Sequence, residues 1–423
     1  MTDKILSTDS YKGVRDFYPD DMAIQRYIFD VWSQTAESFG FERYDASVLE
    51  PADLYKAKGA ENEEMVNEQT YTFIDRGKRE VTLRPEMTPT VARMVAGKRR
   101  ELSFPVRWYS IPNLFRYERP QRGRLREHWQ LNCDIFGANH FTADVEIIAL
   151  AYHMLINFGA EPEMFEIRIN NRASMNQLYT TLGLTDAETT QKITHLNDRK
   201  NKISNDEYFA ELESIVGDRK SAISVVQALD AIDDDNVVVK GLRELGITNV
   251  KNDRYLARGF NYYTGTIFEI FDVSGENNRA MLGGGRYDNL TEMFGGEAIT
   301  GIGFGMGDVT MRDFLETHDL LTANITAPTL MIIPTDVEYN LEAQKIAQEF
   351  RTIAGINVAT DISTKKLGKK IGEASDKMVD YVIVVGENDV KENTFTLKHL
   401  HSDVTKSGDI DHLVQQFVQE IVI

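Results

Sequence analysis

A basic loop in the first third of the chain carries residue types suited to binding phosphate. It runs from Phe115 to Arg124, reads FRYERPQRGR, and follows a strand-like segment. Arg116 stands at the end of that segment, where a rigid, permanently charged guanidinium can be aimed at a phosphate. Arg119 and Arg122 add two more guanidinium groups, and a glycine before the last arginine permits a sharp turn. We predict a phosphate-binding loop, with a solvated basic hairpin as the alternative.

A second arginine that can bind a phosphate lies within an aromatic run. The run reads LARGFNYYT over residues 256–264 and places Arg258 beside a glycine. An arginine is almost never fully buried unless it is paired, so this neighbourhood is unusual for a core strand. We predict a second phosphate-binding group, backed by the hydroxyls of Tyr262 and Tyr263. The alternative is an ordinary edge strand with amphipathic tyrosines.

Glycine recurs at every second position from Gly301 to Gly307, after the run LGGGRYD at residues 282–288. Side chains alternate between the two faces of a strand, so this pattern leaves one face bare. Because glycine weakens a strand, we predict a flat floor where a ligand lies against the backbone. The spacing fits neither a P-loop nor a GxGxxG turn that opens a helix. A closely packed strand without a ligand is the alternative.

Two prolines bracket a carboxylate and a hydroxyl in the segment LRPEMTPT, residues 83–90. Pro85 and Pro89 restrict the backbone around Glu86 and Thr88, and these two side chains can receive an ammonium group. The alternative is a helix N-terminus with an acidic first turn.

Alternating strand and helix patterns position these segments in the first two thirds of the chain. Amphipathic helices are predicted at residues 22–39 and 142–159. Strands are predicted at residues 71–74, 81–83, 106–111, 114–117, 165–169, 255–257, 267–271 and 302–307. A polar, acidic and mostly helical stretch from about residue 172 to 252 interrupts this sheet. We therefore predict one core sheet that is split in sequence by a helical insertion.

A second unit is predicted after Pro328, where strands and helices alternate again. This order predicts a small α/β domain with a largely parallel sheet. The predicted elements are strands at 329–333, 356–360, 380–385 and 394–398 and helices at 338–354, 365–377 and 411–421. The predicted domains are residues 1–325 and 326–423.

The composition of the chain excludes several classes of protein. Its 423 residues are enough for two or three domains, and 42% hydrophobic with 27% charged residues is a globular balance. No run approaches the roughly 20 apolar residues of a membrane span, and the start lacks a signal-peptide pattern. The single cysteine, Cys133, excludes an intrachain disulfide framework and fits a reducing cytosol. Without HxxxH or CxxC spacing, no structural zinc site is predicted.

The net charge of −19 argues at first against a nucleic-acid partner, but basic residues gather locally. Ten Arg or Lys and only two acids lie between Arg93 and Arg126. Four lysines lie within six residues from Lys365 to Lys370. A basic face on an acidic body can bind RNA, and a solvated charged surface is the alternative for the lysines.

Taken in order, these segments resemble the histidyl-tRNA synthetases, which are class II aminoacyl-tRNA synthetases. The resemblance runs from the GVRD at residues 13–16 to the C-terminus. Residues 53–73 look like motif 1 and its sequel, residues 115–124 like motif 2, and residues 301–307 like the start of motif 3. The run RGFNYY from Arg258 is the most specific match. The resemblance implies an α+β catalytic domain, with a helix-flanked antiparallel sheet and a helical insertion, followed by an α/β anticodon-binding domain.

The resemblance also implies a reaction and roles for individual residues. Histidine would be activated with ATP and Mg²⁺ to histidyl-adenylate and transferred to tRNA-His, and Arg116 and Arg258 would act on the α-phosphate. The implied ATP-binding residues are Arg116, Glu118, Arg124, Arg258, Gly305 and Gly307. The implied histidine-binding residues are Glu86, Thr88, Gln130, Asp134, Tyr262, Tyr263 and Tyr287. The implied or predicted tRNA contacts are Gln121, Arg122, Lys365, Lys366, Lys369 and Lys370. A cytoplasmic homodimer is implied, and no metal ligands are assigned.

Three positions depart from the family pattern. Thr310 stands where an ATP-binding arginine ends motif 3, Met87 stands where many relatives have glycine, and Asn261 where many have aspartate. We expect weak ATP affinity with ordinary turnover, a gain in affinity on Thr310→Arg, and partial compensation by the floor at Gly301–Gly307, by Arg124 and by Arg312.

The sequence is also compatible with two other functions. A non-catalytic paralogue, the regulatory subunit of ATP phosphoribosyltransferase, would use the histidine pocket as a sensor, and the missing arginine favours it. The basic loop, Arg258 and the C-terminal domain favour the ligase instead, because a sensor needs neither phosphate groups nor anticodon contacts. The remaining reading is a binding module without activity.

Overall fold

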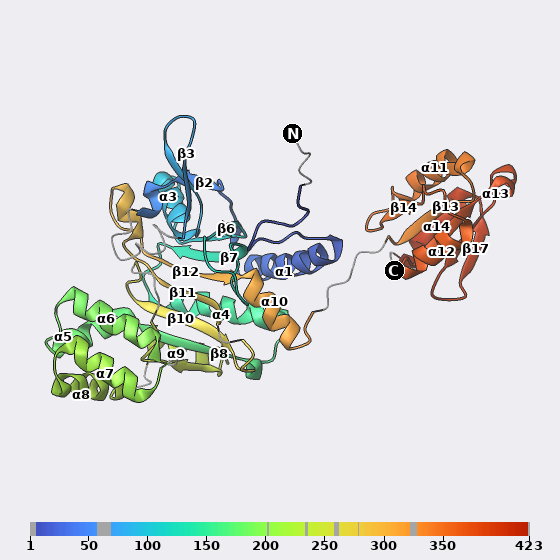
Figure 1. Ribbon diagram of the computed structural model, residues 1–423. Helices are drawn as coiled ribbons and strands as arrows, with labels where there is room; N and C mark the ends of the chain where they lie inside the picture. Colours follow the sequence, from blue (N-terminus) through green and yellow to red (C-terminus); the bar gives the residue numbers. More distant parts are fainter. Residues whose placement is uncertain are drawn as a thin grey trace. The chain divides into compact units, whose positions relative to one another are not determined.

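The computed structural model describes residues 6–56, 69–200, 203–232, 236–257, 262–277, 279–321 and 328–421. The chain divides into two compact units, Met1–Ala323 and Asn324–Ile423, which are drawn from blue to orange and from orange to red in Figure 1. Each unit has its own hydrophobic core. No helix of the described segments is long and apolar enough to cross a membrane.

A nine-stranded sheet forms the centre of the first unit. Its order is β1-β5-β7-β12-β11-β10-β8-β9, and β6 also pairs with β7. The strands are β1 Glu42–Arg43, β5 Val106–Ser110, β6 Asn113–Phe115, β7 Glu127–Phe136, β8 Phe165–Asn171, β9 Val250–Asn252, β10 Thr266–Asp272, β11 Ala280–Arg286 and β12 Gly301–Gly307. Pairing is antiparallel except at β1–β5 and β8–β9. The predicted antiparallel sheet is therefore mixed at both edges, and residues 255–257 do not form the predicted strand.

Helices cover both faces of this sheet. The helices α1 Pro19–Ser38, α4 Phe141–Asn157, α9 Val237–Glu244 and α10 Asp308–Thr317 bury their apolar side chains in one core with β7, β10 and β12. The helix α3 Thr88–Lys98 and the 3-10 turn η5 Leu290–Phe294 pack on the other face. A short helix, α2 Asp53–Lys56, packs against α3. Helix α1 begins with Pro19 and two acids, which suit the free N–H groups of a first turn.

A small sheet of order β2-β4-β3 lies beside α3. Its strands are β2 Leu49–Pro51, β3 Tyr71–Ile74 and β4 Glu80–Leu83, and both pairs are antiparallel. A charged hairpin at residues 75–78 joins β3 to β4, and Lys78 N donates to Asp75 O at 3.0 Å.

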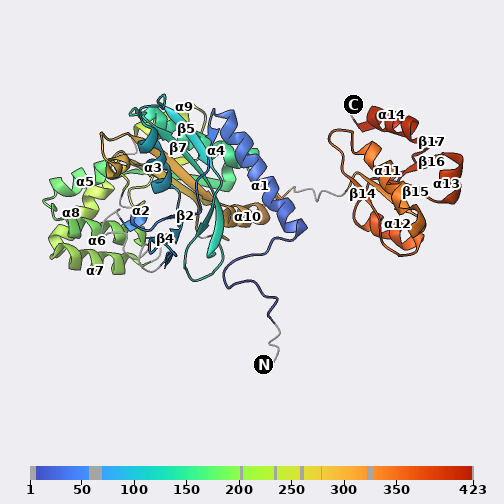
Figure 2. The same ribbon diagram turned by 90° about the horizontal axis from the view of Figure 1, so that it is seen from above.

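Four helices form an insertion after β8, and Figures 1 and 2 show them gathered in one group. They are α5 Arg172–Thr181, α6 Ala187–Asp198, α7 Asn205–Val216 and α8 Arg219–Asp230. Each begins at a capping side chain, Asn171, Asp186, Ser204 or Asp218, that accepts a backbone N–H of the first turn. They bury a separate core. The predicted insertion extended to residue 252, but α9 packs in the main core and β9 pairs with β8, so both belong to the first core.

The second unit contains a five-stranded sheet of order β14-β13-β15-β16-β17. Its strands are β13 Leu330–Pro334, β14 Val358–Thr360, β15 Tyr381–Val385, β16 Phe395–His399 and β17 Thr405–Gly408. Its helices are η6 Val337–Tyr339, α11 Asn340–Phe350, α12 Leu367–Asp376, α13 Glu387–Glu392 and α14 Ile410–Ile421. The first three strands are parallel, as predicted, but β16 and β17 are antiparallel, because α13 is too short to carry the chain back across the sheet.

Candidate active site

The glycine-rich strand β12 has one packed face and one bare face. Ile302, Phe304 and Met306 are buried in the core shared with α4 and α10. The alternate glycines therefore face the opposite side of the sheet. A Cβ atom on Gly303 would collide with Asp134 of β7, and one on Gly305 would collide with the side-chain amide of Gln130. The neighbouring side chains of β7 therefore require glycine at these two positions.

An open cavity with an empty volume of about 500 Å³ lies over this floor. Its lining residues are Glu86, Thr88, Arg116, Gln130, Asn132, Tyr262, Tyr263, Gly283, Tyr287, Gly303, Phe304 and Gly305. Eight of the predicted site residues are in this lining: Glu86, Thr88, Arg116, Gln130, Tyr262, Tyr263, Tyr287 and Gly305. Segments up to about two hundred residues apart in sequence therefore meet at one site.

Asp134 lies at the side of this cavity on β7, in register with Gly303 of β12. The Tyr287 hydroxyl donates to its Oδ1, whereas its buried Oδ2 has no hydrogen-bond partner within the described residues. Burial raises the pKa of Asp134 to about 7, and the hydrogen bond from Tyr287 opposes part of this rise. A buried acceptor without a donor is costly, so Oδ2 is suited to receive an N–H group of a ligand.

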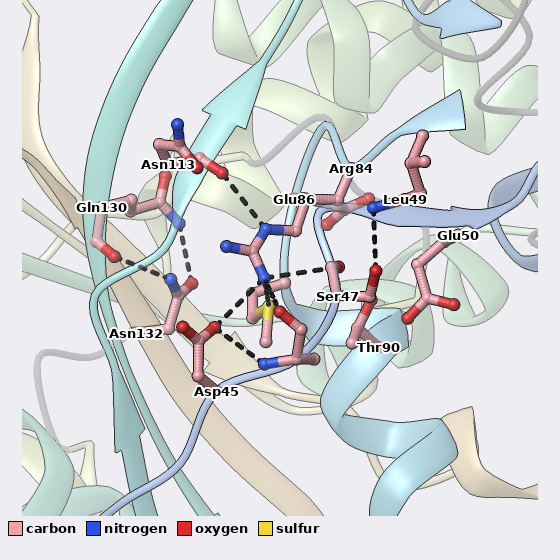
Figure 3. A network of polar contacts seen from close by, with 12 residues as sticks. Asp45, Ser47, Leu49, Glu50, Arg84, Glu86, Thr90, Asn113, Gln130 and Asn132 are labelled. Atoms are coloured by element: carbon pink, nitrogen blue, oxygen red, sulfur yellow. Dashed lines mark hydrogen bonds and ion pairs between the residues drawn. The ribbon is translucent and has the colours of Figure 1, made fainter. Parts of the chain in front are cut away.

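Polar groups that can hold an ammonium lie at another part of the lining. Tyr262 donates its hydroxyl to Glu86 Oε2 at 3.2 Å. Gln130 Nε2 donates to Asn132 Oδ1 at 2.8 Å, and Asn132 Nδ2 donates to the Gln130 carbonyl at 3.0 Å, as drawn in Figure 3. Asn132 was not predicted; its signal was its place two residues from Gln130 on the same strand face.

Arg84 positions the segment that carries Glu86, and it was also not predicted. It is 2% exposed, and its guanidinium donates to the carbonyls of Ala46 at 2.8 Å and Asn113 at 3.2 Å (Figure 3). Arg116 Nε donates to the Pro85 carbonyl at 2.8 Å. Two arginines thus fix the turn before α3, and the signal in the sequence was an arginine directly before a proline.

The basic loop places its arginines in different surroundings. Arg116 lines the cavity, whereas Arg124 Nε pairs with Glu118 Oε2 at 2.7 Å. Gln121 and Arg124 exchange two backbone hydrogen bonds of 2.9 Å, which close the loop and leave Gln121 and Arg122 exposed. Burial, followed by the charge of Arg116, lowers the pKa of His128 to about 3, so this imidazole is neutral beside the arginines.

Several predicted residues are not part of the cavity lining. Glu118, Arg124, Asp134 and Gly307 are outside the cavity lining, and Gly307 is the last residue of β12. Arg258 and Asn261 lie outside the described residues.

Of the four lysines predicted to contact tRNA, Lys370 was predicted wrongly, because it is buried. Its side chain is 2% exposed, Nζ donates to the Pro334 carbonyl at 3.0 Å, and Asp361 Oδ1 is 4.0 Å away. Lys370 therefore anchors α12 to β13 and cannot reach a polyanion. Lys366 and Lys369 are exposed, and Lys365 pairs with Glu373 at 2.6 Å.

Thr310 occupies a small space at the start of α10. Its Oγ1 donates to the Met281 carbonyl at 3.0 Å and lies 3.1 Å from that of Gly307. The expected compensation by Arg312 is wrong, because Arg312 pairs with Asp21 at 3.2 Å and Glu316 at 2.8 Å.

Two family models match this sequence. The model described as histidyl-tRNA synthetase matches residues 13–308, and the model described as anticodon binding domain matches residues 329–420. This chain belongs to the histidyl-tRNA synthetase family. The predicted class II catalytic fold, with its helical insertion and C-terminal anticodon-binding domain, is confirmed at the level of the family.

Relatives in this family match over their full length. A histidine–tRNA ligase of Leptospira biflexa is 41% identical over 439 aligned positions, which cover 100% of both chains. One from Thermoplasma volcanium is 35% identical, covering 96% of this chain and 98% of the relative.

Solved structures share the fold at lower identity. Histidyl-tRNA synthetase from a Nostoc species has a TM-score of 0.78 and 21% identity, covering 99% of this chain and 100% of its own. A Bacillus halodurans protein described as ATP phosphoribosyltransferase regulatory subunit/histidyl-tRNA synthetase has a TM-score of 0.67 and 21% identity, over 91% of this chain and 100% of its own. The synthetase fold therefore does not separate the ligase from the regulatory paralogue.

Proposed function

We propose that this chain activates histidine with ATP to histidyl-adenylate and then transfers the histidyl group to the 3′ end of tRNA-His. Membership of the synthetase family supports the reaction. The single observation in the structure that carries it is the cavity over β12. That cavity combines a bare backbone floor, the guanidinium of Arg116 and, at its side, the unsatisfied carboxylate oxygen of Asp134.

The first step joins two anions, and cationic groups must offset that charge. The histidine carboxylate forms a bond to the α-phosphorus of ATP while the bond to pyrophosphate breaks. Negative charge builds on the oxygens around phosphorus, and a preorganised guanidinium stabilises it by a few kcal/mol. Arg116 and Arg258 would supply this charge, and Mg²⁺ on the phosphates would supply more. Glu118 and Arg124 would contact the adenine side and the terminal phosphates.

The second step transfers the histidyl group to tRNA. The oxygen of a terminal ribose hydroxyl bonds to the activated carbonyl carbon while the bond from that carbon to the phosphate oxygen breaks, and the hydroxyl proton passes to the phosphate of the departing AMP. The exposed Gln121 and Arg122 would contact the acceptor end, and Lys365, Lys366 and Lys369 would contact tRNA from the second unit.

Selection of histidine would depend on the imidazole. The Oδ2 atom of Asp134 would accept an imidazole N–H, while Glu86, Thr88 and Gln130 would hold the ammonium group. A site that leaves a buried acceptor unpaired rejects analogues lacking the donor by about 10⁴-fold or more. We also propose a homodimer and a cytoplasmic location.

The decisive experiment is histidine-dependent exchange of pyrophosphate into ATP, measured across a wide range of ATP concentrations. We expect exchange with histidine and none without it. Arg258→Ala should lower the rate by roughly 10²–10³-fold or more, at unchanged thermal stability, if it stabilises the transition state. A folded protein that binds histidine but gives no exchange at any ATP concentration would indicate the regulatory paralogue.

A further inference from the structure

One arginine that the sequence did not single out stands beside the basic loop. Arg279 directly precedes β11 and is half-buried. Its Cδ lies 3.1 Å from the point where a Cβ on Gly123 would stand, and Thr310 Cγ2 lies 3.5 Å from the same point. The tip of the basic loop, Arg279 and Thr310 therefore meet in one small region, and the φ of +72° at Gly123 favours glycine there.

The guanidinium of Arg279 has cationic surroundings and no direct counterion. Within the described residues it makes no hydrogen bond or ion pair. Partial burial, followed by the charge of Arg124, lowers the pKa of Arg279, and Glu118 only partly opposes this. The carboxylate of Glu118 already pairs with Arg124 at 2.7 Å. Asp313 lies near the loop tip but forms no ion pair with Arg279.

Arg124 and Arg279 are two cations with one carboxylate near them, and only Arg124 pairs with it, so the two guanidinium groups repel each other in the empty site. Their repulsion is relieved when a polyanion binds between them, and guanidinium groups suit phosphate oxygens because they donate two parallel hydrogen bonds. The neighbouring Arg116 lines the cavity over the glycine floor. The phosphates of an ATP molecule bound in that cavity would therefore lie beside the basic loop that carries Arg116 and Arg124.

We propose that Arg279 is an ATP-binding residue that contacts the outer phosphates together with Arg124, in the place left open by the small side chain of Thr310. This inference rests on the proposed function. Thr310 and Arg279 adjoin the same point at the loop tip, so an arginine at position 310 would enter the space that Arg279 fills. The two positions are alternatives for one cation, and the expectation that Thr310→Arg improves ATP affinity in the natural chain is replaced.

Pyrophosphate exchange kinetics and calorimetric binding of ATP with Mg²⁺ test this assignment. A charge-assisted hydrogen bond contributes about 1.5–3 kcal/mol, so Arg279→Ala should raise the ATP Michaelis constant by roughly 10–100-fold. The histidine Michaelis constant should stay the same. The matched control is Arg312→Ala, because Arg312 lies two residues after Thr310 on α10 but pairs with Asp21 and Glu316. Its ATP constant should not change.

The decisive comparison adds Thr310→Arg in two backgrounds. It should restore ATP affinity in Arg279→Ala and give no gain in the natural chain. An unchanged ATP constant in folded Arg279→Ala, or an equal effect of Thr310→Arg in both backgrounds, overturns the assignment while leaving the proposed function intact. If the natural chain gives no exchange, the proposed function fails and calorimetry alone decides: weaker ATP binding by Arg279→Ala supports the assignment, and equal binding rejects it.

Discussion

Asp134 is a buried carboxyl group whose surroundings oppose its charge. Its pKa of about 7 lies above the ordinary value of 3.8 because desolvation outweighs the hydrogen bond from Tyr287. In the absence of ligand, the folded protein holds this proton more tightly than the unfolded chain does. The carboxyl therefore lowers stability increasingly as pH rises from about 4 to about 7, and stability is unaffected by it below that window.

We predict that Asp134→Asn stabilises the ligand-free protein at pH 8 and leaves its stability unchanged near pH 4. The gain at pH 8 is at most about 4 kcal/mol, from a shift of roughly three pKa units at about 1.4 kcal/mol each. The asparagine Oδ1 still accepts from Tyr287, so packing is preserved. Thermal unfolding at both pH values measures this.

The same variant should bind histidine at least about tenfold more weakly at pH 8, because Nδ2 then stands in the place of Oδ2 and cannot accept the imidazole N–H. A loss of stability at pH 8, or unchanged histidine affinity, would contradict the role of Asp134.

At the scale of elements, alternation in the sequence predicted which face of β12 would be bare. It did not predict that β7 supplies Gln130, Asn132 and Asp134 beside that face. Register depends on pairing between distant segments, which local patterns do not encode. The same limit explains Lys370: periodicity placed it on a basic helix, but only the packing of α12 against β13 buries it. The sequence did not predict a role for Arg279, because it lies far in sequence from the basic loop and approaches that loop only in the folded protein.

Gly305→Ala tests whether the bare face serves the ligand. The new Cβ would displace the amide of Gln130 from its hydrogen bond to Asn132, and that amide can move without disturbing backbone. We expect a folded protein whose histidine affinity falls about tenfold or more, the loss of roughly one charge-assisted contact. Gly97→Ala is the control, because its Cβ would meet no atom within 4 Å and alanine favours helix α3. Equal histidine affinity in both variants would argue against the floor.

The lysines at the N-cap and in the first turn of α12 differ in exposure: Lys366 and Lys369 are exposed, whereas Lys370 is buried. Lys366→Ala with Lys369→Ala should weaken tRNA binding and reduce its salt slope by up to about 2, because each phosphate contact releases a counterion. Adenylate formation should not change. Lys370→Met should leave the salt slope unaltered, since Nζ is held by the Pro334 carbonyl. Filter binding of tRNA at several salt concentrations measures both, and an unaltered slope in the double variant means a solvated helix face.

At the scale of the whole molecule, the two units have independent cores and different chemistry. The first unit contains the cavity, the glycine floor and the basic loop. The second matches an anticodon binding domain. The sequence predicted this division, because strand and helix patterns begin to alternate again after Pro328 and such patterns are local. The sequence did not predict where the insertion ends. The segment of α9 and β9 has the same polar pattern as the four helices before it, but it packs with the main core and sheet.

Ending the chain at Leu321 should separate the two steps of the reaction. Every described residue of the cavity precedes this point, and the main core contains no residue beyond it. We therefore expect histidine-dependent pyrophosphate exchange with turnover within about threefold of the full chain, because the groups around phosphorus remain. Transfer to tRNA-His should fall about 10²-fold or more in kcat/KM, since binding energy from the anticodon end is lost. Gel filtration and thermal unfolding first establish that the shortened chain is folded. If that folded chain loses exchange as well, the second unit contributes to the chemistry of activation; if it still charges tRNA normally, the second unit does not read the anticodon.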